Sequence, residues 1–282
     1  MKCFPLVKTV LDEVYEQVPG QTDAEKDKRI EAALEVLHDQ YTQLLTGVHI
    51  DYSDSAIRFA YIYRYVTSHA NIVYQRILSS PELQKIFDAT KVTVACIGGG
   101  PGSDFLGILK FTIQQGKISA LKCFLFDREA AWGESWSDVD DKLGTELRVS
   151  TYFQQFDVTK PDTWQIHTKY LQADLFTMIY FVSEIFSAGQ EAAPYFVQMF
   201  QKAKCGSYFL YVDNKESSFR RWFDGIAKNH DLELVAGKSV DVSLGAFPDE
   251  NKEDLGKYYD KFGWPKMKAA IDYRIYRKPC VI

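Results

Sequence analysis

The segment CIGGGPG, residues 96–102, most constrains the fold of this chain. It joins a short β-rich run, residues 92–97, to a stretch with the three- and four-residue apolar spacing of a helix, residues 105–116. Glycines at alternate positions allow positive φ and leave no Cβ in the way, and the helix beyond Gly102 begins with free N–H groups. This pattern predicts a strand, a glycine turn and a helix, with a ligand lying against the main chain of the turn.

The same unit recurs along the rest of the chain. Further strands are expected at residues 121–127, 151–157, 174–182 and 206–214, and helices at residues 128–144, 192–203 and 218–229. Strands that alternate with helices predict a parallel sheet with right-handed crossovers. The last two runs, 232–244 and 269–279, are joined by a polar loop, residues 248–265, that offers no helix long enough for a crossover, so they should pair as an antiparallel edge.

The first 90 residues are expected to be helical. One amphipathic helix should span residues 23–45, a second should run from a cap at Ser53 or Asp54 to residue 78, and Ser80 with Pro81 should open a short third. The second helix is crowded with aromatic side chains, which favours packing on another domain or lining of a pocket. We therefore expect an N-terminal helical extension or cap, residues 1–88, and an α/β domain, residues 89–282.

Composition places the chain among ordinary globular proteins. It has 282 residues, 33 Lys and Arg against 38 Asp and Glu, and a net charge of −5, which argues against binding nucleic acid through a wholly basic surface. Five widely spaced cysteines suggest neither a disulfide framework nor a metal site, and Cys123 and Cys205 are expected in the core. With no signal peptide and no membrane span in the sequence, we expect a cytoplasmic protein, a nuclear location not being excluded.

Two other uses of a glycine turn fit this segment poorly. A P-loop requires Gly, four residues and then Gly-Lys-Ser/Thr, and neither the Lys nor the Ser or Thr follows at the right place here. The dinucleotide fingerprint G-x-G-x-x-G/A, counted from Gly98, places its third position on Ser103. The observed spacing is G-x-G-x-G, although a nicotinamide-dependent oxidoreductase stays open as an alternative.

With this spacing the chain resembles the class I S-adenosylmethionine-dependent methyltransferases, whose first motif is an acid, any residue and then G-x-G-x-G after the first strand. The resemblance covers about residues 88–279 and implies a Rossmann-like, doubly wound, seven-stranded sheet with an antiparallel terminal strand. Cys96 departs from the motif, because it stands where the family has an acid. The carboxylate must then come from elsewhere or be absent.

The resemblance also implies a set of cofactor contacts. Asp127 ends the second strand, 25 residues past Gly102, where an acid can accept both ribose hydroxyls. Asp157 matches the acid that faces the adenine amino group, with Phe156 as a wall for the ring, although Asp157 could instead cap a helix. The cofactor-binding residues expected from this match are Ile97, Gly98, Gly99, Gly100, Gly102, Asp127, Arg128, Phe156, Asp157 and Phe181.

Catalytic residues are harder to assign, since methyl transfer mainly requires alignment and exclusion of water. Glu184 follows the fourth strand and could take a proton, orient the cofactor's amino group or cap a helix. Tyr65 and His69 are candidates if the aromatic helix covers the pocket. Residues 252–278 carry eight Lys or Arg against four acids, which could touch phosphates but is more often a solvated face.

The acceptor is left open as a small molecule, a protein or RNA. No (D/N/S)PP(Y/F) motif follows the fourth strand, so DNA is not expected, and neither is a membrane partner. GGGPGSD, Asp127 and Trp132 look somewhat like ribosomal-RNA uridine-N3 methyltransferases. The remaining alternative is a catalytically silent protein that keeps the fold and binds a cofactor or a partner.

Overall fold

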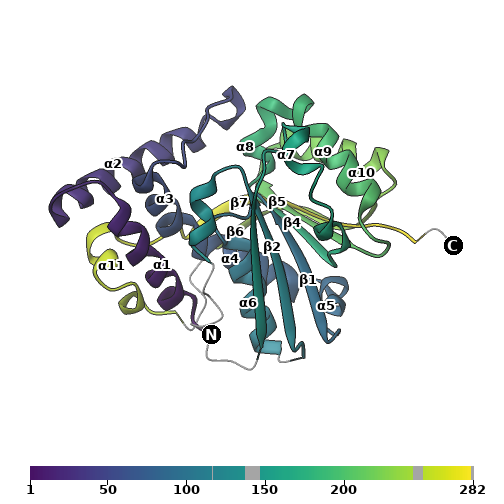
Figure 1. The fold of residues 1–282 in the computed structure, drawn as a ribbon, viewed down its shortest axis with the longest axis horizontal. Helices are drawn as coiled ribbons and strands as arrows, with labels where there is room; N and C mark the ends of the chain where they lie inside the picture. The colour runs from purple at the N-terminus through teal and green to yellow at the C-terminus, as the bar shows by residue number, and fades with distance from the viewer. Residues whose placement is uncertain (116, 137–146, 244–249, 281–282) are drawn as a thin grey trace.

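A seven-stranded mixed sheet forms the centre of the molecule (Figure 1). The computed structural model describes residues 1–115, 117–136, 147–243 and 250–280. The strand order is β3-β2-β1-β4-β5-β7-β6, with β1 to β5 parallel, β7 antiparallel to β5 and β6 antiparallel to β7. The strands are β1 Lys91–Ile97, β2 Ala120–Asp127, β3 Arg148–Gln155, β4 Leu175–Ile179, β5 Tyr208–Asn214, β6 Glu233–Ser243 and β7 Lys268–Arg277. The predicted Rossmann-like sheet with a reversed terminal strand is confirmed.

Helices cover both faces of the sheet, because strands buried on both sides need an apolar layer on each. One layer holds α6 Ser103–Gln115, together with α4 Thr67–Leu78 and α5 Pro81–Ile86 of the N-terminal part. The other layer holds α7 Pro161–Trp164, α8 Val182–Ile185, α9 Gly189–Lys202 and α10 Ser217–Asn229. Phe176, Phe200, Phe209 and Phe223 pack in this second layer. The helices expected at 192–203 and 218–229 are therefore confirmed.

The N-terminal part is helical, as predicted. It comprises α1 Cys3–Gln17, α2 Asp23–Tyr41, α3 Ser55–Tyr61, a π-helical turn η2 Ile62–Val66, α4 Thr67–Leu78 and α5 Pro81–Ile86. The side chain of Asp54 accepts a hydrogen bond from the Ala56 N–H and that of Ser80 from the Leu83 N–H, so both expected caps form. The π-helical turn interrupts the long helix predicted from residue 54. That residues 1–88 form a separate domain stays a prediction.

Several element boundaries differ from the predictions. β4 ends at Ile179, three residues early, because Tyr180 has a φ of 55° and cannot continue a strand. Within the predicted helix 128–144, residues 130–134 form a 3-10 turn, and residues 137–144 lie outside the described part. The polar loop 248–265 contains α11, Lys257–Phe262, a short helix that packs near α1.

The expectation that the cysteines form no disulfide is wrong for one pair. Cys205 and Cys280 are joined, with their Cα atoms 5.0 Å apart, and both are exposed, so Cys205 is not a core residue. Antiparallel pairing of β5 with β7 brings them together, since the Gly206 N–H donates to the Lys278 carbonyl beside them. Their separation of 75 residues gave no sign of this contact. Cys123 is buried and free, as expected.

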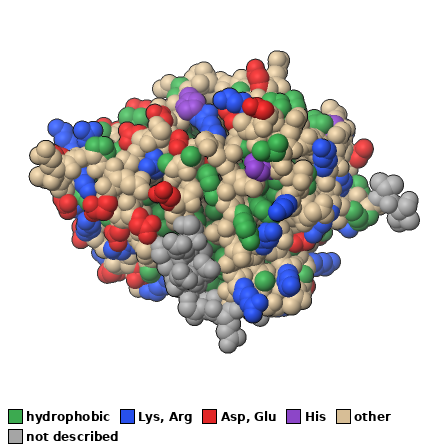
Figure 2. Space-filling model, viewed as in Figure 1, with side chains coloured by type: hydrophobic (Ala, Val, Ile, Leu, Met, Phe, Trp, Pro, Cys, Tyr) green, Lys and Arg blue, Asp and Glu red, His purple; other side chains and the backbone are tan. Residues whose placement is uncertain are grey.

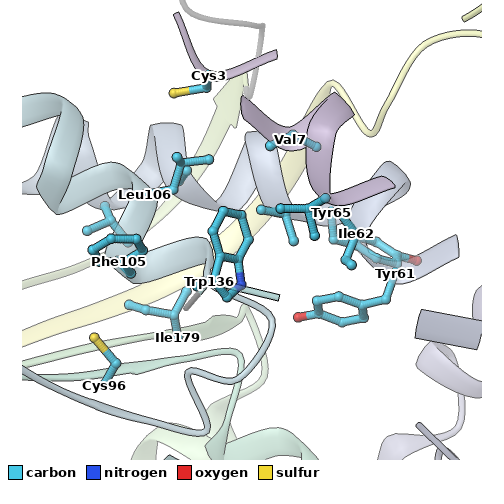
Figure 3. Close-up of a cluster of buried hydrophobic side chains, with 14 of the residues drawn as sticks. Cys3, Val7, Tyr61, Ile62, Tyr65, Cys96, Phe105, Leu106, Trp136 and Ile179 are labelled. Atoms are coloured by element: carbon cyan, nitrogen blue, oxygen red, sulfur yellow. The ribbon is translucent and has the colours of Figure 1, made fainter. Parts of the chain in front are cut away.

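A hydrophobic core runs from the N-terminal helices to the sheet. Figure 3 shows the indole of Trp136 between Leu106 of α6 and Tyr61 of α3, with Cys96 and Ile179 of the strands below it. Trp136 is 2% exposed, so this contact buries one of the largest side chains in the chain. Across the described ranges, no helix is long and apolar enough to cross a membrane.

Candidate functional site

A cavity of about 220 Å³ lies at the carboxyl ends of the parallel strands. The residues that follow β1, β2, β3 and β4 form its floor, and a segment between α2 and α3 covers it from the N-terminal side. In open α/β sheets this edge is where ligands bind. Its lining includes Leu44, Gly47, His49, Ile50, Tyr52, Tyr61, Gly98, Asp127, Arg128, Phe156, Asp157, Val158, Ile179, Tyr180, Phe181 and Glu184.

The glycine turn packs closely against several side chains and, at Gly98, also lines the cavity. Gly98, at φ 70°, lines the cavity, and a Cβ there would lie 2.2 Å from the Phe181 ring. A Cβ at Gly100 would lie 2.7 Å from Trp132 and 2.8 Å from Asp127, whereas one at Gly102, at φ 88°, would lie 2.1 Å from Trp136. Glycine is therefore required by close packing at all three positions.

The other residues predicted from the glycine motif lie away from the cavity wall. Ile97 is fully buried at the end of β1, and a Cβ at Gly99 would meet the Cys96 side chain at 2.4 Å. Gly100 and Gly102 also lie outside the lining. Of the residues expected around the turn, Gly98 alone faces the cavity, and the part of the others in cofactor binding stays a prediction.

A buried carboxylate, that of Asp104, lies beside Cys96, which stands where the methyltransferase motif has an acid. Asp104, in the first turn of α6, is 1% exposed; its Oδ2 accepts a hydrogen bond from Thr177 Oγ1 of β4 at 2.5 Å. Burial raises the pKa of Asp104, while hydrogen bonds from Thr177 and Cys96 oppose the increase. Asp104 thus places a carboxylate of α6 beside Cys96, and it is not among the residues that line the cavity.

Asp127 ends β2 and faces the cavity. Its Oδ1 accepts the Glu129 N–H at 3.0 Å, and the Gly100 N–H also bonds to this carboxylate. Burial raises the pKa of Asp127 to about 7, and the negative charge of Glu184 adds to the increase, while Arg128 opposes it. The Asp127 side chain is partly exposed at the cavity, and with these two donors it keeps acceptor capacity for the hydroxyls of a ligand.

Asp157 lines the cavity, and its side chain closes the turn before α7 without capping that helix, whose N-cap residue is Lys160; its contact with adenine stays a prediction. Its Oδ1 accepts the Thr159 N–H at 2.9 Å and the Thr159 hydroxyl at 2.6 Å, and Oδ2 lies 3.6 Å from Lys160 Nζ. Burial raises the pKa of Asp157, but these donors and cations outweigh it and hold the pKa below its usual value. Phe156 is buried beside it, while Arg128 is exposed.

Glu184 anchors a group of tyrosines that the sequence analysis did not identify. The hydroxyls of Tyr41 and Tyr52 both donate to Glu184 Oε1, each at 2.9 Å. Burial raises the pKa of Glu184 to about 7, which the two tyrosine hydrogen bonds oppose. Both tyrosines belong to the N-terminal part, so no local pattern around residue 184 could have revealed them.

The other two predicted catalytic residues lie in a neighbouring cavity of about 590 Å³. Tyr65 and His69 line it, and Tyr180 lines both cavities. His69 is 1% exposed, its two ring nitrogens have no hydrogen-bond partner, and its ring stacks on Tyr180. Burial holds the pKa of His69 well below its usual value, helped by the charge of Lys266, so the imidazole is neutral.

Tyr180 and Lys266 are two further residues of this region that the sequence does not mark as functional. Tyr180 falls within a predicted strand, and only its backbone conformation distinguishes it. Lys266 belongs to the basic segment expected to be a solvated face, yet it lines the second cavity. Within the ranges described, no group of three His, Cys, Asp or Glu side chains could hold a metal ion.

Comparison with known proteins identifies the fold. No family model matches the chain, and no curated protein matches it in sequence. An O-methyltransferase family protein from Burkholderia thailandensis superposes with a TM-score of 0.52, at 13% identity over 95% of this chain and 76% of the other. A SAM-dependent methyltransferase from Methanosarcina mazei gives 0.47, at 11% identity over 72% and 99%. The fold is that of the class I S-adenosylmethionine-dependent methyltransferases.

Proposed function

We propose that the chain is an S-adenosylmethionine-dependent methyltransferase. The observation that carries the proposal is the partly buried carboxylate of Asp127, which has acceptor capacity to spare and faces a cavity at the carboxyl edge of the sheet beside Gly98. The fold supports it, because the same edge of this sheet order is the ligand-binding edge of open α/β proteins.

The donor set fits the adenosyl part of this cofactor. Asp127 offers carboxylate oxygens to a ribose diol, and Asp157 and the Val158 backbone lie at the next strand end. Phe126 and Phe156 both line the cavity and pack on each other at a tilt of 33°, with ring centroids 4.5 Å apart, which gives an apolar surface that suits a flat purine. Phe126 and Asp127 end β2, and residues 156–158 directly follow β3, so the pairing of these two parallel strands sets the spacing of the groups.

The fit extends to the amino-acid end. Tyr41 and Tyr52 occupy only Oε1 of Glu184, which leaves Oε2 for an ammonium group. Tyr52, Tyr61 and Phe181 surround this end of the cavity, exclude water and offer aromatic faces to a cation. When bound, S-adenosylmethionine supplies an electrophilic methyl carbon, and the chain's own residues have only to hold it and position an acceptor.

The test is stabilisation by the product cofactor, S-adenosylhomocysteine. At 100 times its Kd this ligand should add about 2.7 kcal/mol to the free energy of unfolding, and Asp127→Ala should lose most of that gain. Asp88→Ala, a change at an exposed acid far from the cavity, is the matched control. Equal stabilisation of Asp127→Ala, or stabilisation by a nicotinamide cofactor instead, would refute the proposal. Turnover of a labelled methyl group then separates an enzyme from a silent binding protein.

A further inference from the structure

The second cavity has the position, size, charge and polar lining of a ligand-binding site. It lies beside the cofactor cavity, with Tyr180 forming part of both walls, at the ends of β4 and β5. At about 590 Å³ it has the size of a small-molecule site. The residues that matter here are Arg64, Tyr65, His69, Tyr180, Lys266 and Lys268.

Charge in this cavity is one-sided. Arg64, Lys266 and Lys268 line it, and no Asp or Glu does. Among the described residues, none of the three has a carboxylate partner within 4.0 Å. Asp213, whose charge acts on Tyr180, is engaged by backbone donors, since its oxygens accept the Ser183 and Asn214 N–H groups at 2.8 Å each.

Lys266 is held in place rather than trailing in solvent. Its N–H donates to the Arg64 carbonyl at 2.9 Å, and the Tyr63 hydroxyl bonds to the Gly263 carbonyl nearby. Its Nζ lies 5.4 Å from the Tyr65 ring centroid and 5.9 Å from that of Tyr180. Burial lowers the pKa of Lys266, and the neighbouring Arg64 lowers it further. Two adjacent cations without a counter-charge favour an anionic ligand.

His69 supplies a polar group inside the same wall. It is 1% exposed, and neither of its nitrogens has a hydrogen-bond partner in the part of the chain that the structure describes, although buried polar atoms in proteins are nearly always hydrogen-bonded. Its ring lies between Tyr180, 3.9 Å away between centroids, and Tyr65, at 5.4 Å. Two backbone irregularities also meet here, the π-helical turn that carries Arg64 and the positive φ of Tyr180. Such irregularities concentrate at functional sites.

We propose that this cavity binds the methyl acceptor, and that the acceptor is a small planar molecule with an anionic group, held by Lys266 and Arg64 against the tyrosine rings. The proposal rests on the proposed function for the identity of the ligand as acceptor, but not for the binding itself. A carboxylate and a phosphate share the chemistry that these two cations recognise.

Binding can be measured without knowing the natural acceptor. Benzoate and phenyl phosphate are the anionic probes, and benzamide is the neutral probe of the same shape as benzoate. We expect calorimetry to show that at least one anionic probe binds wild type at least tenfold more tightly than benzamide does. The stronger of the two identifies the kind of anion. Equal affinity for benzoate, phenyl phosphate and benzamide, or no binding of any probe, overturns the proposal.

Variants locate the site. Lys266→Met and Arg64→Met should each weaken the anionic probe about tenfold or more and leave the Kd of S-adenosylhomocysteine unchanged, while Lys117→Met, at an exposed lysine elsewhere, should change neither. Should either variant fail to fold, Lys266→Gln and the comparison with benzamide still decide the matter. Probe binding that Lys266 and Arg64 variants do not affect contradicts the proposal, as does an RNA oligonucleotide binding there when the small anions do not.

The two proposals fail separately. If S-adenosylhomocysteine binds wild type and the anionic probes do not, the cavity assignment is wrong and the cofactor assignment stands. If the probes bind and the cofactor does not, the anion site stands and its ligand is not a methyl acceptor.

Discussion

The rings of His69 and Tyr180 are stacked, with centroids 3.9 Å apart and an interplanar angle of 14°. His69 belongs to α4 of the N-terminal part and Tyr180 follows β4, so this contact joins the helical extension to the edge of the sheet. The pair lies where the two cavities adjoin. The helical extension therefore helps to build the candidate site instead of only covering it.

Among the described residues the buried Tyr180 hydroxyl has no hydrogen-bond partner, whereas the Tyr180 ring stacks on His69. Tyr180→Phe should leave the free energy of unfolding unchanged or raise it by up to about 1 kcal/mol, because it removes an unsatisfied group. Tyr180→Ala should lower it by about 3 to 5 kcal/mol through the lost ring. Urea denaturation measures both. A loss above 1 kcal/mol in Tyr180→Phe would show that the hydroxyl has a partner in the folded protein.

The glycine turn is predicted to tolerate no side chain. Gly102→Ala places a Cβ 2.1 Å from Trp136 in a left-handed conformation, so it should cost more than the conformation alone. Gly206→Ala is the matched control, since Gly206 has a φ of 80° and nothing lies within 4 Å of its Cβ position. We expect Gly206→Ala to lower the free energy of unfolding by about 1 to 2 kcal/mol, and Gly102→Ala to lower it by at least about 1 kcal/mol more. Equal losses in thermal or chemical unfolding would contradict the packing argument.

Cofactor affinity should depend on pH through Asp127 and Glu184, whose pKa values are both raised to about 7. The ionised forms accept ribose hydroxyls and attract an ammonium group, so the Kd of S-adenosylhomocysteine should fall as pH rises from 6 to 8, by up to about tenfold per pH unit below 7 for each proton released. Calorimetry measures it. In Asp127→Asn the part of this dependence due to Asp127 should disappear, and an unchanged profile would count against its role.

The same two carboxyls predict how the unliganded protein responds to pH. Their pKa values lie above those of the unfolded chain, near 4, so between about pH 4 and 7 the folded state binds more protons than the unfolded state does. Their contribution to the free energy of unfolding is therefore greatest at low pH and falls as pH rises towards 7. In Asp127→Asn this part of the slope, measured by urea denaturation across that range, should be smaller.

A buried ion pair fastens the start of α1 to α6. Lys110 Nζ lies 3.4 Å from Glu250 Oε1, both side chains are at most 1% exposed, and Glu250 also accepts the Phe4 N–H at 2.9 Å. Lys110→Met should destabilise the protein by about 3 to 5 kcal/mol, because it leaves a buried charge with one partner fewer. Asp88→Ala, which breaks the exposed pair with Lys117, should cost at most about 1 kcal/mol. Similar losses in the two variants would be inconsistent with this assignment.

Thiol counting checks the disulfide. Five cysteines less the two in the Cys205–Cys280 bond leave three free thiols, all buried. An unreduced sample should therefore show three reactive thiols after denaturation and almost none while folded. Five thiols after denaturation would mean that the bond does not form in the sample.

Charges of both signs are interspersed over the face shown in Figure 2, with acidic side chains gathered over the region of α1, α2 and α11. The basic tail noticed in the sequence is not one surface. Lys261 pairs with Asp27 at 2.6 Å and Arg274 with Asp224 at 3.3 Å, while Lys266 lines a cavity. This dispersal is the reason that a small anion, and not an extended nucleic acid, is proposed as the ligand of Lys266.

Local patterns in the sequence predicted the seven strands in their chain order, the glycine turn with the helix after it, Asp127 at the end of β2 and Asp157 just beyond β3. Each of these depends on residues close together in the chain, where periodicity, turn chemistry and caps act. The sheet's reversed end was also predictable, because no helix could connect the last two strands by a crossover.

Only the tertiary structure decided what these elements enclose. Tyr41 and Tyr52 reach Glu184 across more than 130 residues, Asp104 of α6 lies beside Cys96 of β1, and Lys266 lies near the ring of Tyr180. Such contacts depend on how helices pack on the sheet and leave no period or spacing in the sequence. The cavity proposed for the cofactor lies at strand ends that follow from the chain's local order, whereas the groups proposed to select an acceptor come together through packing between distant segments.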